Sequence, residues 1–192
     1  GILAMTSIAL AACVSSSTEM ATTWKDPGVG KVHFDKVLTL FVSRDPAIRR
    51  QGEDDLAAKI PNATPAYQVV PESDLKDPAV VKQKVKEGGF DGAVVMRIVQ
   101  VAQQSTYVPG TTWYTGPYDF WGYWGNSWGA VYTPGYAMTD QVVTVESALY
   151  SVAGNRLLWA GRSETIDPKN LTKLIDGVTK SAVKEMKKQG LL

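Results

Sequence analysis

The residues with the most informative chemistry stand near the start of the chain, where small side chains precede its single cysteine. Residues 1–12 are mostly apolar and end in Leu10-Ala11-Ala12, and Cys13 follows directly. An apolar run that closes on small residues is typical of a secretory signal, because it must enter a bilayer and then fit a narrow peptidase site. The run is shorter than the about 20 apolar residues that span a membrane. The pattern therefore predicts export, with cleavage between Ala12 and Cys13.

A cysteine directly after such residues resembles the lipobox of bacterial lipoproteins. The resemblance implies that residues 1–12 are the remnant of a signal peptide and that the thiol of Cys13 carries a lipid anchor such as palmitate. No basic residue precedes the apolar run, so we expect the chain to begin inside its signal peptide. Val14, in place of an aspartate after the cysteine, is typical of enteric lipoproteins sorted to the outer membrane. We therefore expect a lipid-anchored envelope protein on the outer membrane, facing the periplasm.

The composition excludes several classes of function. Twenty Lys and Arg balance nineteen Asp and Glu, so we expect no general attraction to nucleic acid and no nucleic-acid partner. Cys13 and His33 are the only cysteine and histidine, which excludes a Cys/His zinc cluster and a disulfide within the chain. They also disfavour a Cys–His or Ser–His nucleophilic pair. We expect no metal, no cofactor, no catalytic residues and no enzymatic activity.

A second group of chemically distinctive residues lies in an insert rich in glycine and aromatic residues, residues 107–136. Most of the tyrosines and tryptophans of the chain stand there, and Asp119 is its only charged residue. Glycine and proline argue against a regular helix or strand, and an irregular segment of this length is usually functional or disordered. Its candidate binding residues are Trp113, Tyr114, Tyr118, Trp121, Tyr123, Trp124 and Trp128.

Four roles for residues 107–136 stay open. The segment is a partly disordered hairpin tip, a platform that stacks on sugars of peptidoglycan or lipopolysaccharide, a membrane-interface anchor, or a protein-docking site. Asp119 lacks the second carboxylate that glycoside hydrolysis usually needs. The leading hypothesis is a non-enzymatic binding or scaffold module that contacts its partner through this insert; the alternative is a glycan-binding module or weak glycan-cleaving enzyme. We expect the fold to survive deletion of residues 111–133.

Hydrophobic patterns on either side of the insert predict the elements that position it. Strands are expected at residues 36–42, 67–70, 92–101, 141–152 and 156–166. Helices are expected after Asp45-Pro46, after Asp77-Pro78 and after Asp167-Pro168. The order predicts an α/β fold, similar to an α+β sandwich, with a mixed sheet of about five strands and helices mainly on one face. Residues 13–23 are expected to form a flexible tether, and residues 24–192 a single domain.

Charged residues inside these elements give two further predictions. Arg97 interrupts an apolar strand, so it either marks a solvated edge of the sheet or pairs with Glu146 on the neighbouring strand. We favour the pair, because an unpaired buried guanidinium is costly. The helix after Asp45-Pro46 carries an apolar stripe of Ile48, Leu56 and Ile60. We expect its charged residues to face water: Arg49, Arg50, Glu53 and Asp54.

Short segments along the whole chain carry a resemblance to one family. They are Cys13 with its Ser/Thr-rich sequel, Trp24-Lys25-Asp26-Pro27, Phe34-Asp35-Lys36-Val37, residues 89–93, and residues 155–161 after the aromatic insert. Together they resemble an uncharacterised family of bacterial lipoproteins that share a domain of unknown function. The resemblance implies an envelope-anchored α/β domain whose partner is an unknown envelope protein or glycan. It supplies no catalytic residues.

Overall fold

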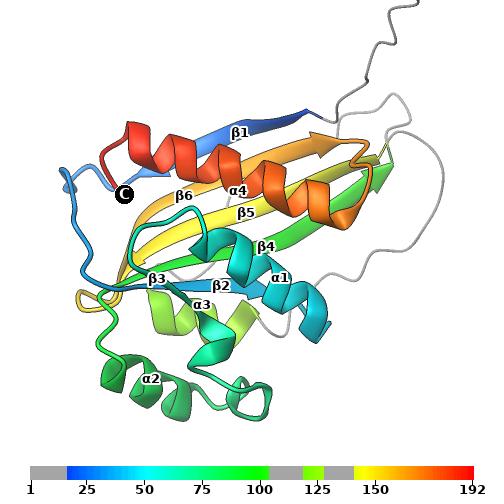
Figure 1. Cartoon of the computed structure of the whole chain (residues 1–192). Helices are drawn as coiled ribbons and strands as arrows, with labels where there is room; N and C mark the ends of the chain where they lie inside the picture. The colour runs from blue at the N-terminus through cyan, green and yellow to red at the C-terminus, as the bar shows by residue number, and fades with distance from the viewer. Residues whose placement is uncertain (1–16, 104–118, 128–140) are drawn as a thin grey trace, which may run out of the picture.

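A mixed β-sheet forms the centre of the computed structural model, which describes residues 17–103, 119–127 and 141–192 (Figure 1). Within these residues the strand order is β1-β6-β5-β4-β2-β3. The strands are β1 (Thr18–Lys25), β2 (Val37–Val42), β3 (Ala63–Pro65), β4 (Gly92–Gln103), β5 (Gln141–Ser151) and β6 (Arg156–Ile166). β2 runs parallel to β3 and β4, and the other neighbours are antiparallel. The expected α+β class is confirmed, with one strand more than expected.

Helices begin where aspartate and asparagine side chains can cap them. They are α1 (Pro46–Ala57), α2 (Pro78–Glu87), α3 (Phe120–Ser127) and α4 (Leu171–Lys188). Asp45 and Asp77 each accept two backbone N–H groups in front of a proline, as expected of an N-terminal cap. The cap of α4 is Asn170 and not the expected Asp167, whose carboxylate instead accepts the backbone N–H of Gln141.

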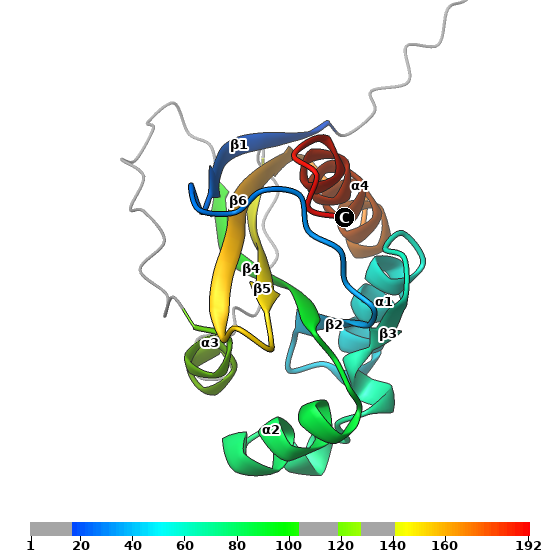
Figure 2. The same cartoon turned by 90° about the vertical axis from the view of Figure 1, so that its left-hand side faces the viewer.

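The four helices divide between the two faces of the sheet. α1 and α4 cover one face, and α3 and α2 lie on the opposite side (Figure 2). Alternate residues of each strand feed these two layers: Phe41 and Met96 pack toward α1 and α4, whereas Leu40 and Val95 pack toward α2 and α3. Every residue of β2 is buried because both of its faces are covered. The helices are thus only partly on one face.

Strand β1 occupies most of the segment that was expected to be a tether. Thr18 pairs with Thr165 and Lys25 with Trp159 along β6, and the hydroxyl oxygens of Thr18 and Thr165 lie 2.8 Å apart. An edge strand buries little of its side-chain surface, so β1 can be polar and lacks the apolar pattern that predicts a strand. The expected tether is therefore wrong from Thr18 onward, and the ordered domain begins before Trp24.

The strand expected at residues 67–70 is also wrong. The short strand β3 precedes it, and Ala66–Gln68 form the single 3-10 turn η1. The backbone N–H of Tyr67 donates to Oε2 of Glu53 at 2.6 Å, and the carbonyl of Val70 accepts from Nη2 of Arg49 at 3.2 Å. Side chains of α1 therefore satisfy backbone groups that a strand would have paired with a neighbouring strand.

Helix α3 lies inside the insert that was expected to be irregular. Asp119 accepts the backbone N–H of Gly122 at 2.7 Å, and the rings of Phe120, Tyr123 and Trp124 are buried beside Tyr150. A glycine costs a helix about 1 kcal/mol. Each large ring buries on the order of 150–250 Å², or several kcal/mol at about 25 cal/mol per Å². Burial outweighs propensity, so deletion of residues 111–133 would remove part of the core, contrary to expectation.

Candidate functional site

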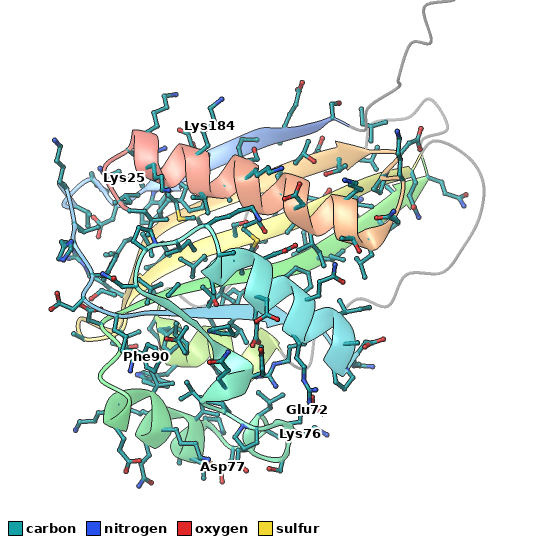
Figure 3. The ribbon with its side chains drawn as sticks, in the orientation of Figure 1. Lys25, Glu72, Lys76, Asp77, Phe90 and Lys184 are labelled. Atoms are coloured by element: carbon teal, nitrogen blue, oxygen red, sulfur yellow. The ribbon has the colours of Figure 1, made fainter. Side chains whose placement is uncertain are left out.

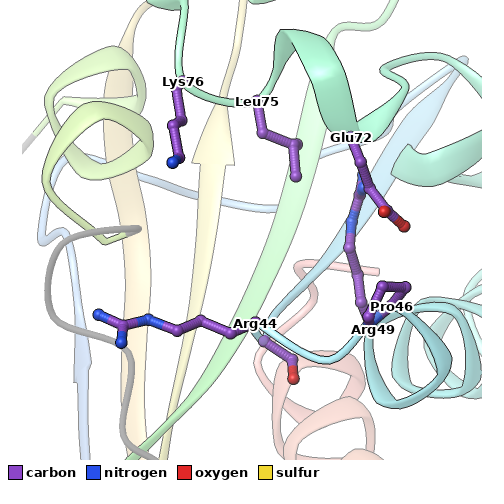
Figure 4. Close-up of a pocket in the computed structure, with 7 residues that line it drawn as sticks. Arg44, Pro46, Arg49, Glu72, Leu75 and Lys76 are labelled. Atoms are coloured by element: carbon purple, nitrogen blue, oxygen red, sulfur yellow. The ribbon is translucent and has the colours of Figure 1, made fainter.

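A pocket of about 480 Å³ opens at the carboxyl end of β2, between the start of α1 and the segment around the 3-10 turn η2 (Glu72–Asp74) (Figure 4). Ligands of parallel sheets usually bind beyond the carboxyl ends of the strands, where loops converge. The residues that line it are Ser43, Arg44, Pro46, Arg49, Glu72, Leu75 and Lys76.

Two exposed cations border the opening of this pocket. Arg44 extends from the end of β2, and Lys76 comes from the opposite side, after η2 (Figure 4). Neither side chain forms an ion pair with any residue that the structure describes. The acid of the lining, Glu72, faces Arg50, with Oε1 3.6 Å from Nη2. The described residues therefore make the opening basic.

A buried ion pair stands behind the pocket. Nε of Arg49 donates to Oε1 of Glu53 at 2.8 Å, and the two side chains are 1% and 0% exposed. Burial raises the pKa of Glu53 to about 7, although the Arg49 charge and the hydrogen bonds to the carboxylate oppose the rise. Through the bonds to Tyr67 and Val70, the pair holds the chain that leads into η2 against α1.

The expectation that Arg49 and Glu53 face water is wrong. The buried stripe of α1 consists of Arg49, Gly52, Glu53 and Leu56, at helical spacing. A Cβ atom on Gly52 would lie 2.3 Å from Cγ of Phe41, so the helix approaches β2 more closely than any larger residue permits. Gly52 is the signal that marks this face, because a glycine in the middle of a helix often indicates close packing.

The predicted pair of Arg97 and Glu146 is present. The residues are register partners on β4 and β5, and Nε of Arg97 lies 3.1 Å from Oε1 of Glu146. Arg162 on β6 is the next register partner of Glu146. The hydroxyl of Tyr123 from α3 donates to the same Oε1 at 3.4 Å. Burial raises the pKa of Glu146, while Arg97 opposes the rise.

The aromatic candidates fall into three groups. Tyr123 and Trp124 are buried, so the expectation that they present a binding surface is corrected: they hold α3 in the core. Trp121 is half-buried, with Nζ of Lys82 5.6 Å from the centre of a ring. The others, like the lipidation-site residues Ala12 and Cys13, lie outside the described residues: Trp113, Tyr114, Tyr118 and Trp128.

The described ranges contain neither a cluster of metal ligands nor a membrane-spanning helix. No three His, Cys, Asp or Glu residues within them lie close enough together to hold a metal ion. None of the helices in the same ranges has both the length and the apolar character needed to cross a bilayer.

Comparison with known proteins gives weak structural similarity. No family model matches the chain, and no curated protein sequence is detectably similar to it. A variant of the PelC dodecamer from Paraburkholderia phytofirmans is 12% identical over 88% of this chain and 96% of that chain, with a TM-score of 0.45. The PelC dodecamer from the same organism in a second crystal form is 10% identical over 88% of this chain and 97% of that chain, with a TM-score of 0.44. Lipoprotein GNA1162 from Neisseria meningitidis is 13% identical over 80% of this chain and 98% of that chain, with a TM-score of 0.38.

Proposed function

We propose that this protein is a lipid-anchored binding module of the cell envelope that acts without catalysis. Its lipid is attached to Cys13, and its partner contacts come from the aromatic insert. The observation that supports the anchor is the sequence Leu10-Ala11-Ala12-Cys13, and β1 is paired into the sheet from Thr18 onward, a few residues later. An anchor at Cys13 would therefore pull on the folded sheet almost directly.

The length of the connection limits how far the domain stands from its membrane. Only three residues separate Cys13 from Ser17, the first described residue. At about 3.6 Å per extended residue, the four steps from Cys13 to Ser17 span at most about 14 Å, whatever their conformation. This proposed anchor holds one edge of the sheet near the lipid headgroups and raises the effective concentration of the module for partners there.

Helix α3 supports the binding role of the insert because it fixes the middle of that segment. The rings of Phe120, Tyr123 and Trp124 hold the helix against β5 and α2. Trp113, Tyr114 and Tyr118 precede this attachment in the sequence, and Trp128 follows it. A segment attached at its middle loses less conformational entropy on binding than one attached only at its ends.

The anchor is tested in cells fed labelled palmitate. The full-length protein should incorporate label and fractionate with the outer membrane, and Cys13→Ser should do neither. Label on the Cys13→Ser variant, or a wild-type protein that stays unlabelled, would contradict the lipidation of Cys13.

The binding role of the insert is tested by replacing with alanine the four candidate binding residues outside the described ranges: Trp113, Tyr114, Tyr118 and Trp128. Trp24→Ala, an exposed tryptophan on β1, is the control. In-cell crosslinking from position 115 should capture a partner with the wild type and with the control, but not with the fourfold variant. Co-sedimentation with purified peptidoglycan that depends on the four rings would support the glycan alternative. Capture that survives the fourfold change refutes the contact.

A further inference from the structure

We infer that the pocket at the carboxyl end of β2 is an anion site that takes a phosphate group, either free or on a lipid headgroup. Arg44 and Lys76 supply the charge, and Ser43 supplies a hydroxyl donor. Guanidinium and ammonium groups are the side chains that most often bind phosphate, because their hydrogen bonds to it are charge-assisted. The lipid-headgroup source rests on the proposed anchor at Cys13; the free-phosphate source does not.

Donors at the opening are available for a ligand. Oγ of Ser43 accepts the backbone N–H of Asp45 at 3.1 Å, which leaves its own proton to donate. Arg44 and Lys76 are exposed and have no acidic partner among the described residues. The first amides of α1 do not contribute, because the side chain of Asp45 already accepts those of Ala47 and Ile48. The site is therefore built from side chains.

The acids around the opening are engaged elsewhere. Asp45 caps α1, and Glu72 faces Arg50. Oδ2 of Asp74 lies 2.9 Å from Nζ of Lys84, and that contact lowers the pKa of Asp74. Among the described residues, these acids therefore leave the charges of Arg44 and Lys76 without direct compensation.

The size of the pocket leaves room for more than a bare phosphate. A water molecule occupies about 30 Å³ of liquid volume, so about 480 Å³ also accommodates the glycerol or sugar to which a phosphate is attached. Leu75 and Pro46 give the wall two apolar surfaces that suit such a group.

The topology places this pocket and the proposed anchor on one edge of the sheet. β2 runs toward the end of the sheet where β1 begins, because three antiparallel steps and one parallel step separate them, and the register places Val42 level with Thr22, four residues after Thr18 (Figure 1). Four strand spacings of about 4.8 Å across the sheet, with four residues of about 3.3 Å along it, put the end of β2 roughly 23 Å from the start of β1. The connection from Cys13 lets the domain turn this end of the sheet, and with it Arg44 and Lys76, toward headgroups of the anchoring membrane.

The first test uses inorganic phosphate and the full chain carrying Cys13→Ser. Titration should shift the backbone amide NMR signals of Ser43, Arg44 and Lys76, and Arg44→Gln with Lys76→Gln should weaken binding at least tenfold. Lys86→Gln with Lys184→Gln removes the same charge from exposed sites elsewhere; Lys184 lies across the molecule from Lys76 (Figure 3). That control should bind as the wild type does. Equal loss in both double variants, or unshifted pocket signals, would overturn the site.

The second test separates the two sources of phosphate. Vesicles of phosphatidylcholine that contain phosphatidylglycerol are mixed with the same three proteins. Binding that the pocket variant loses, and that inorganic phosphate displaces, identifies a lipid headgroup as the source. Vesicle binding unaffected by the pocket variant, together with intact phosphate titration, identifies free phosphate. Neither result depends on palmitate labelling of Cys13, so failure of the anchor and failure of the pocket are distinguishable.

Discussion

Two arginine–glutamate pairs lie in this domain, and they differ in how the surrounding chain uses them. Arg49–Glu53 lies within α1 with both side chains buried, and it also satisfies backbone groups of Tyr67 and Val70. Arg97–Glu146 crosses from β4 to β5, and the Arg97 side chain keeps 19% of its surface exposed. The two residues are register partners in the antiparallel ladder, directly before its irregularity between Ile98 and Gln100.

The difference shows that burial alone does not set the importance of an ion pair. An isolated buried pair barely offsets its desolvation cost. Arg49–Glu53 does more, because it also bonds the carbonyl of Val70 and the backbone N–H of Tyr67. Glu146 accepts hydrogen bonds on Oε1 from Arg97 and Tyr123, whereas no described residue donates to its Oε2. We therefore expect Arg49–Glu53 to contribute more to the free energy of unfolding than Arg97–Glu146.

The largest expected effect is that of Glu53→Ala. The change leaves the Arg49 guanidinium buried without its carboxylate and removes the acceptor of the Tyr67 amide, which should cost about 3–5 kcal/mol of unfolding free energy. Glu146→Ala is the matched change in the other pair and should cost less than half as much. Urea denaturation of both variants measures this. Equal losses of unfolding free energy would show that the two pairs contribute equally to stability.

The pH dependence of stability should follow the same distinction. Glu53 has a pKa near 7 in the folded state, raised mainly by burial, and about 4.5 as its ordinary value. The folded protein therefore holds the proton more tightly, so the stability that Glu53 contributes is full below about pH 4.5 and is lost as pH rises to about 7. Glu146 adds to this trend, because its pKa is also raised. Asp74 and Asp176 have lowered pKa values, so the stability that they contribute is lost only in more acidic solution.

Denaturation midpoints between pH 4.5 and 7 test this expectation. Glu53→Gln should flatten most of the slope, and Glu146→Gln should flatten less of it. A wild-type stability that rises with pH in this window would show that Glu53 is already ionised in the folded state.

The smallest expected effect is the coupling within Arg97–Glu146. Arg97→Met and Glu146→Gln, made singly and together, should be non-additive by about 1 kcal/mol, because Arg97 is partly hydrated and Arg162 also neighbours the carboxylate. Thermal or chemical unfolding of the four proteins completes the cycle. Additive costs would mean that the 3.1 Å contact does not stabilise the protein.

Features set by local sequence patterns were predictable from the sequence, whereas those set by contacts between distant parts of the chain were not. The pair Arg97–Glu146 was predictable because each residue interrupts an apolar strand, and alternation assigns both to a sheet face. Arg49–Glu53 was not, because a charged i, i+4 pair on a helix is far more often solvated. Its burial follows from the approach of α1 to Phe41, which Gly52 permits. Strand β1 was missed because its pairing with β6 bridges distant parts of the chain.

The amino-acid sequence by itself determined the local features: three of the helix positions and the strands around Leu40, Val95 and Trp159. It also carries the pattern ending at Cys13 on which the proposal of export and lipidation rests. These depend on periodicity, caps and contiguous residues, which act over a few positions. Only the tertiary structure decided that Tyr123 and Trp124 belong to the core and that Arg44 and Lys76 border one pocket. Those outcomes depend on which distant surfaces meet, because burial against a partner outweighs the preference of any single residue.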